Sequence, residues 1–149
     1  MDVGPPNVIA INHDDDCAKY VGRTADGRQF ILTLPFEPAI AGHTGSEFVA
    51  LYIFDAKGKL LEARIADFGP QATLDKQERR NVYEGWLREL GDVTFARIEV
   101  APFAVERFDA TFGLVVREPE EPDDPWAVEM QPGNYMAFFE PWDSGEYDT

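Results

Sequence analysis

The chain has 149 residues, 44% of them apolar and 13% aromatic, and its 28 acidic and 13 basic side chains give a formal net charge of −15. Its length fits one domain over residues 1–149, and its apolar content supports a core, which excludes a wholly disordered chain. Because no basic patch or stripe offsets the acidity, nucleic acid and anionic membranes are excluded as partners.

Compartment and targeting are predicted from what the sequence lacks. Residues 1–6 have neither the basic region nor the apolar run of a signal peptide. No stretch approaches the roughly 20 apolar residues of a membrane helix. The only cysteine, Cys17, excludes an internal disulfide framework and fits a reducing compartment. We therefore expect a soluble, cytoplasmic protein.

The first predicted element is a β-hairpin. Residues 18–24 and 28–34 flank an Ala-Asp-Gly turn at 25–27, and Asp-Gly between apolar segments is the strongest local hairpin signal. Pro35 and Pro38 end the second strand, because proline cannot donate a ladder hydrogen bond. The hairpin should therefore cover residues 18–34.

A central strand is predicted next. The Gly-rich connector 42–46 leads into residues 48–54, a run of seven apolar residues without a charged position. Such a run is typical of a strand that is covered on both faces. A turn at 55–58 then leads into another strand over 60–68, so a second hairpin is expected here.

The one clear helical pattern covers about residues 75–90. Asp75 is placed to cap the N-terminus, and Glu78 completes the spacing of a capping box. Gly91 supplies the stop. A single apolar stripe at helical spacing suits a helix that lies on a sheet face; it consists of Val82, Trp86, Leu87 and Leu90.

Strands follow the helix to the end of the chain, the last two of them around a Pro-Gly-Asn turn at 132–134. Many strands with a single helix indicate the α+β class. We predict a largely antiparallel, meander-like sheet of about six to eight strands, built from hairpins, with one amphipathic helix packed on it. The later strands cover residues 93–100, 103–108, 112–116, 126–130 and 135–140.

The charge is concentrated at the C-terminal end. From Glu118 to Thr149 the chain carries ten carboxylates and no Lys or Arg. Three prolines and five acids predict an exposed, extended loop at 118–125. The remaining segment, 126–149, is both acidic and aromatic, so its rings should pack while its carboxylates face solvent.

Two short segments contain reactive residue types but not the pattern of a site. His13 to Cys17 (His-Asp-Asp-Asp-Cys) has metal-ligand chemistry, yet adjacent side chains diverge, and a solvated loop in which Asp side chains cap turns explains it. Neighbouring aspartates disfavour a reactive Cys17 thiolate. His43 and Ser46 lack the strained turn of a catalytic serine. No catalytic residue, metal or cofactor is therefore predicted.

The preferred hypothesis is a non-enzymatic protein-binding module, of the inhibitor or immunity type, that engages a basic partner. Aromatic side chains would anchor the partner, and carboxylates would steer it and pair with its Lys or Arg side chains. The candidate binding residues are Trp126, Glu140, Trp142, Asp143, Glu146, Tyr147 and Asp148.

Two alternatives stay open. Carboxylates that converge beside Trp or Tyr would suit a small carbohydrate- or cation-binding protein, or a hydrolase, and would require a concave pocket. An exposed strand edge would instead suit a structural role as a homodimer. Both a monomer and a homodimer are therefore compatible with the sequence.

Overall fold

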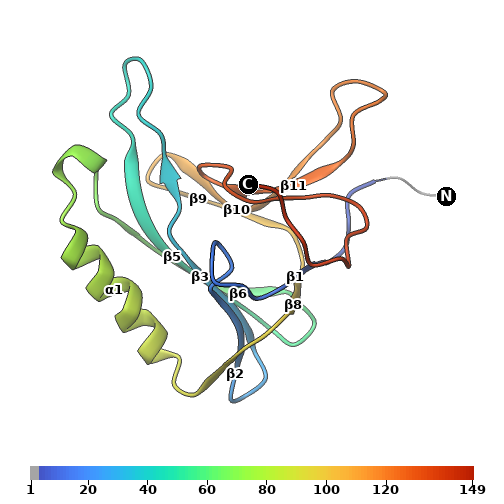
Figure 1. Ribbon diagram of the computed structural model, residues 1–149, viewed down its shortest axis with the longest axis horizontal. Helices are drawn as coiled ribbons and strands as arrows, with labels where there is room; N and C mark the ends of the chain where they lie inside the picture. The colour runs from blue at the N-terminus through green and yellow to red at the C-terminus, as the bar shows by residue number, and fades with distance from the viewer. Residues whose placement is uncertain (1–3) are drawn as a thin grey trace.

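The structure, a computed structural model, describes residues 4–149 (Figure 1). Over these residues twelve strands and one α-helix follow one another, and all pairs of strands are antiparallel. The α+β class, with one helix on antiparallel sheet, is therefore confirmed. The elements are β1 (Ile9–Ile11), β2 (Tyr20–Thr24), β3 (Gln29–Thr33), β4 (Phe36–Glu37), β5 (Ser46–Phe54), β6 (Leu60–Asp67), the 3-10 helix η1 (Gln71–Thr73), α1 (Lys76–Glu89), β7 (Val93–Phe95), β8 (Ile98–Val100), β9 (Phe103–Arg107), β10 (Ala110–Arg117), β11 (Ala127–Gln131) and β12 (Ala137–Phe138).

The strands form three sheets rather than one meander. The largest has the order β4-β5-β3-β2-β7, with β6 also paired to β5; the second has the order β12-β11-β10-β9; and β1 pairs with β8 alone. There are more strands than the sequence predicted, partly because residues 93–100 do not form one strand. They divide into β7, which pairs with β2, and β8, which pairs with β1.

Strand β5 is central, and its residues 48–54 are buried on both faces, as their uncharged sequence predicted. It pairs with β3 on one side and with β6 on the other. Because side chains alternate along a strand, β5 contributes to two separate cores. Phe48, Tyr52 and Phe54 face the core that includes β10 and β11, whereas Val49 and Leu51 face the helix.

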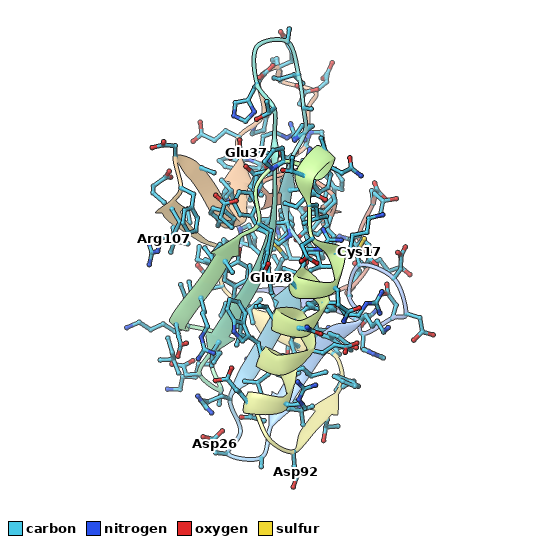
Figure 2. The ribbon with its side chains drawn as sticks, turned by 90° about the vertical axis from the view of Figure 1, so that its left-hand side faces the viewer. Cys17, Asp26, Glu37, Glu78, Asp92 and Arg107 are labelled. Carbon is cyan, nitrogen blue, oxygen red and sulfur yellow. The ribbon has the colours of Figure 1, made fainter. Side chains whose placement is uncertain are left out.

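The helix begins and ends where its capping residues predicted. The Asp75 carboxylate accepts a 3.0 Å hydrogen bond from the Glu78 amide, which satisfies one free donor of the first turn. Gly91, with φ at +78°, follows the last turn. Figure 2 shows α1 lying across the large sheet. The apolar stripe packs there as expected, and Tyr83 packs with it: Val82, Tyr83, Trp86, Leu87 and Leu90.

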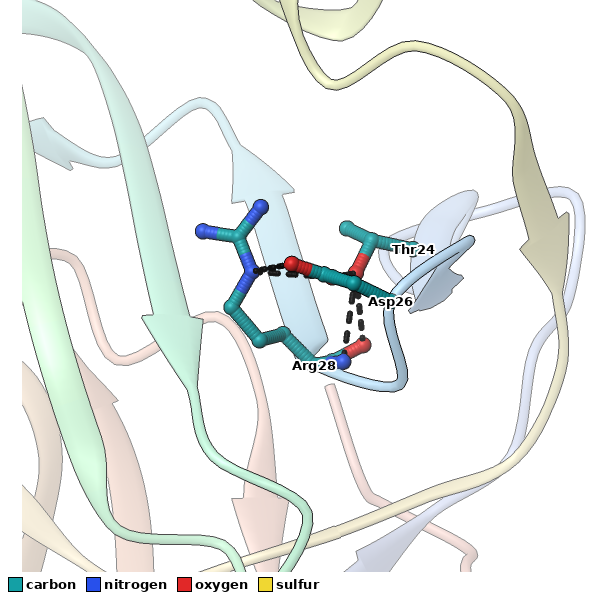
Figure 3. Close-up of polar contacts among 3 residues, drawn as sticks. All are labelled: Thr24, Asp26 and Arg28. Atoms are coloured by element: carbon teal, nitrogen blue, oxygen red, sulfur yellow. Dashed lines mark hydrogen bonds and ion pairs between the residues drawn. The ribbon is translucent and has the colours of Figure 1, made fainter.

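Side-chain bonds hold the turn of the β2–β3 hairpin (Figure 3). The Thr24 hydroxyl donates to the Asp26 carboxylate, and Arg28 Nε donates to both oxygens of that carboxylate at 3.0 Å. These bonds, from Thr24 first and Arg28 second, lower the pKa of Asp26. The Asp-Gly turn predicted from the sequence is therefore present.

Residues 118–125 form no helix or strand and project from the body between β10 and β11 (Figure 1). All of them except Pro119 are exposed. Within residues 4–149, no helix has both the length and the apolar character needed to cross a bilayer.

Candidate functional site

The C-terminal segment 141–149 is fixed to the body by main-chain hydrogen bonds on two sides. On one side the amides of Ala10 and Asn12 donate to the carbonyls of Trp142 and Gly145, each at 2.9 Å. On the other side Ala137 and Asp148 exchange two bonds of 2.9 Å. Chain ends fray unless they are held in this way, so the acidic tail belongs to the folded surface.

Close contact with Asn12 also explains the glycine within this segment. Gly145 is buried, with φ at +80°, and a Cβ atom at this position would collide with the Asn12 side chain. Next to it, Arg97 Nη2 donates a 2.6 Å hydrogen bond to the Asp143 carbonyl. A basic side chain from the β7–β8 region therefore helps to hold the acidic tail.

Two of the seven predicted binding residues act mainly as anchors. Trp142 and Tyr147 pack against the core beneath the tail, and the Tyr147 hydroxyl donates to the Asp14 carboxylate. Burial raises the pKa of Asp14, but the bonds from Tyr147 and from the amides of Asp16 and Ala18 outweigh burial and lower it. In the His13–Cys17 segment, Asp14 therefore caps a turn and holds the tail.

The structure brings Trp126 and Glu140 together in a hollow of about 440 Å³, which we call the acidic cavity. It lies between the projecting loop and the chain that follows β12. Its walls are mostly apolar, and its two carboxylates belong to Asp124 and Glu140. The lining residues are Pro119, Pro122, Asp124, Pro125, Trp126, Phe139 and Glu140.

The remaining predicted residues lie elsewhere. Glu146 and Asp148 line a separate polar hollow of about 480 Å³, together with the anchor Tyr147 and with Asp14 and Asp16. Asp143 lines neither hollow, and its side chain is exposed. The seven residues therefore do not form a single site.

Sequence reasoning missed five of the seven residues of the acidic cavity, among them Asp124, one of its two carboxylates. Pro119, Pro122 and Pro125 supply its loop wall and Phe139 part of the rest. The three prolines recur at every third position, but the loop turns between them, where the Asp124 amide donates to the Glu121 carbonyl at 3.0 Å, so their spacing alone does not indicate a shared wall. Phe139 carries no signal either, because the sequence alone does not show on which side of the last strand it lies.

The described residues do not assemble a reactive centre from the two segments singled out above. His43 Nδ1 accepts a 2.9 Å bond from the Gly45 amide, and its Nε2 lies 3.5 Å from Glu37, so neither nitrogen bonds Ser46. Burial, and then Asp16 and Asp14, raise the pKa of the Cys17 thiol. Within residues 4–149 no three His, Cys, Asp or Glu side chains gather into a possible metal site.

Comparisons of the chain with protein-family models, with curated proteins and with solved structures found no significant match.

Proposed function

We propose that the chain is a non-enzymatic binding module for a basic partner protein, and that the acidic cavity receives a Lys or Arg side chain of that partner. One observation carries this proposal. The cavity combines the apolar surfaces of Trp126 and Phe139 with the carboxylates of Asp124 and Glu140. All of its residues follow Arg117, the last basic residue of the chain.

The chemistry of the cavity matches a cationic side chain with an apolar stem. Such side chains bury their methylene groups against apolar surface while the charged end seeks acids and water. A cation over an aromatic face gains about 0.5–2 kcal/mol, depending on how far it is desolvated. Trp126 and the two carboxylates supply both kinds of contact in one hollow.

The projecting loop would act earlier, during approach. Its five carboxylates are exposed, and the one base nearest to them in sequence, Arg117, is bonded to Glu129 on β11 at 2.8 Å. Exposed charges of one sign mainly raise the association rate, and salt screens that effect over about 8–10 Å. Binding to this surface should therefore weaken as salt rises.

A small carbohydrate is the second candidate for the same cavity. Trp126 lines the cavity beside the carboxylates of Asp124 and Glu140, and glycoside hydrolases use two carboxylates that flank the bond to be cut. Soluble oligosaccharides, tested in the assay below, separate the two candidates. A sugar ligand would bind with little dependence on salt.

The test is calorimetric titration of hexa-arginine, with hexa-glutamate as the control peptide, at low salt and at about 0.5 M NaCl. Hexa-arginine should bind at low salt and weaken at high salt. Trp126→Ala and Glu140→Gln should each weaken it, whereas Asp92→Asn, which removes an exposed carboxylate after α1 (Figure 2), should not. Equal binding by the Trp126→Ala variant, or binding that is indifferent to salt, would overturn the proposal.

A further inference from the structure

A second cavity, of about 360 Å³, has the opposite charge. It lies beside the first half of α1, where three basic residues of the helix meet Lys19, which precedes β2. Four of the chain's 13 basic residues therefore line one hollow in a protein of net charge −15. We call it the basic cavity; its cations are Lys19, Lys76, Arg79 and Arg80.

Most of these cations are not neutralised. Of these four cations, only Arg79 has a carboxylate of the described chain within 4.0 Å, that of the half-buried Glu47 at 3.2 Å. Lys19 Nζ lies over the ring of Tyr20, 5.3 Å from its centroid. Asp16 and Glu84 also line the cavity, but neither forms an ion pair with a cation of the described chain. The positive charge of Lys76 and Arg80 is therefore open to a ligand.

Aromatic and aliphatic side chains form the rest of the wall. The rings of Tyr20 and Tyr83 lie 5.0 Å apart at an angle of 34°, and Leu34 lines the cavity beside them. Burial raises the pKa of Tyr83, so this phenol stays neutral at physiological pH. The cavity thus pairs cationic side chains with apolar ring surface.

The basic cavity adjoins a smaller hollow of about 210 Å³, because Asp16, Leu34 and Tyr83 line both. Tyr135 and Cys17 line this smaller hollow; Figure 2 shows Cys17 beside α1. The Tyr135 hydroxyl is already bonded to the Thr33 hydroxyl at 2.7 Å. Apart from the Asp16 carboxylate, the smaller hollow therefore offers ring, hydroxyl and thiol surface.

We propose that this composite cavity binds a small aromatic oxyanion. The anionic group would bind Lys76 and Arg80 at the helix, and the ring would lie against Tyr83, toward the smaller hollow. The cavity's volume lies within the roughly 300–1,000 Å³ of small-molecule sites, and Arg supplies a planar, doubly donating contact for phosphate or carboxylate. The inference is independent of the function proposed for the acidic cavity.

The test uses three probes that separate charge from ring: phenyl phosphate, inorganic phosphate and phenol, each titrated by calorimetry. Phenyl phosphate should bind about tenfold or more tightly than either fragment, and Arg80→Gln and Lys76→Gln should each weaken it by about tenfold, the worth of one charged hydrogen bond. Lys57→Gln, which removes a base from the β5–β6 turn, should change nothing. Inorganic phosphate binding as tightly as phenyl phosphate, or undiminished binding by Arg80→Gln, would overturn the proposal.

Cys17 provides a second readout in the unmodified protein. Saturating phenyl phosphate should slow the alkylation of Cys17 by iodoacetamide, because the ring would fill the hollow that the thiol lines. The protection should be absent in Arg80→Gln and intact in Trp126→Ala, which changes only the acidic cavity. An unchanged alkylation rate at saturation would show that the ring does not enter, against the proposal.

Discussion

The acidic cavity and the basic cavity carry opposite charge, and the chain builds them in different ways. The acidic cavity comes from one continuous stretch, residues 119–140, that lacks any basic residue. The basic cavity joins Lys19 to the first half of α1, two segments far apart in the chain. The net charge of −15 therefore does not show how charge is distributed over the surface, because the fold brings together the few basic residues as well as the many acidic ones.

The two regions also differ in how they are held. Main-chain bonds to β1 and β12 fix the C-terminal tail, whereas the apolar stripe of α1 holds the helix on the large sheet. Tail carboxylates should therefore tolerate substitution without unfolding. Substitution of the tail's Gly145, Trp142 or Tyr147 should instead destabilise the fold.

The largest expected effect is a difference in stability between alanine variants of the two tryptophans in residues 126–149. Trp142 packs against the core, so Trp142→Ala should lower the free energy of unfolding by about 3 kcal/mol. Trp126 lines an open cavity, so Trp126→Ala should cost about 1 kcal/mol or less while weakening hexa-arginine binding. Urea unfolding of both variants measures this. Equal losses would contradict the division into anchor and binding residue.

The next effect tests the docking of the tail. Gly145→Ala should lower the free energy of unfolding by about 2 kcal/mol. The added Cβ atom would collide with the Asn12 side chain, and alanine disfavours the positive φ at this position. Gly42→Ala is the matched control, since Gly42 has a similar φ of +78° but open space around its Cβ position. Its cost should be about 1 kcal/mol, from backbone strain alone. Indistinguishable losses would mean that the tail does not press on Asn12.

A smaller pair of opposite effects concerns the tyrosines between β3, β5 and the last hairpin. Within the described chain the buried Tyr52 hydroxyl has no hydrogen-bond partner, so Tyr52→Phe should raise the free energy of unfolding by about 1 kcal/mol. Tyr135→Phe should lower it by about 1 kcal/mol, because it leaves the buried Thr33 hydroxyl unpaired. Thermal unfolding of both variants checks the signs, and a common sign would contradict these assignments.

The smallest effect is a pH dependence at the tail. The folded protein holds the pKa of Asp14 below its usual value of 3.8, so the stability from this carboxylate is present above that pH and is lost as the pH falls through the folded pKa. Tyr147→Phe removes one of the bonds responsible. The stability difference between the variant and the wild type should therefore shrink from about pH 5 to about pH 2. A constant difference would show that Tyr147 acts by packing alone.

Local chemistry predicted the parts of the fold that depend on neighbours in sequence. Asp75 and Gly91 set the helix ends, and Asp26-Gly27 set the first hairpin turn. The pairing of β1 with β8 and the docking of the tail on β1 join segments from opposite halves of the chain. No local pattern encodes such pairings, which is why residues 93–100 were predicted as one strand.

The same limit applies to the sites. Trp126 and Glu140 were predicted because acids and aromatics crowd the C-terminal sequence, but their grouping with Phe139 depends on the last hairpin. Residues of the basic cavity escaped prediction altogether. Nothing in the sequence around Lys19 indicates a site, and the basic residues of α1 have the pattern of an ordinary solvent-exposed helix face. Only the fold places these residues beside Lys19.

The most direct test of two oppositely charged sites is one NMR titration series on uniformly ¹⁵N-labelled protein, with hexa-arginine and phenyl phosphate as probes. We predict that hexa-arginine shifts the Trp126 indole and the Glu140 amide and leaves the amides of Arg80 and Tyr83 in place, while phenyl phosphate does the reverse. Both probes shifting the same residues, or hexa-arginine leaving Trp126 and Glu140 unmoved, would contradict the account.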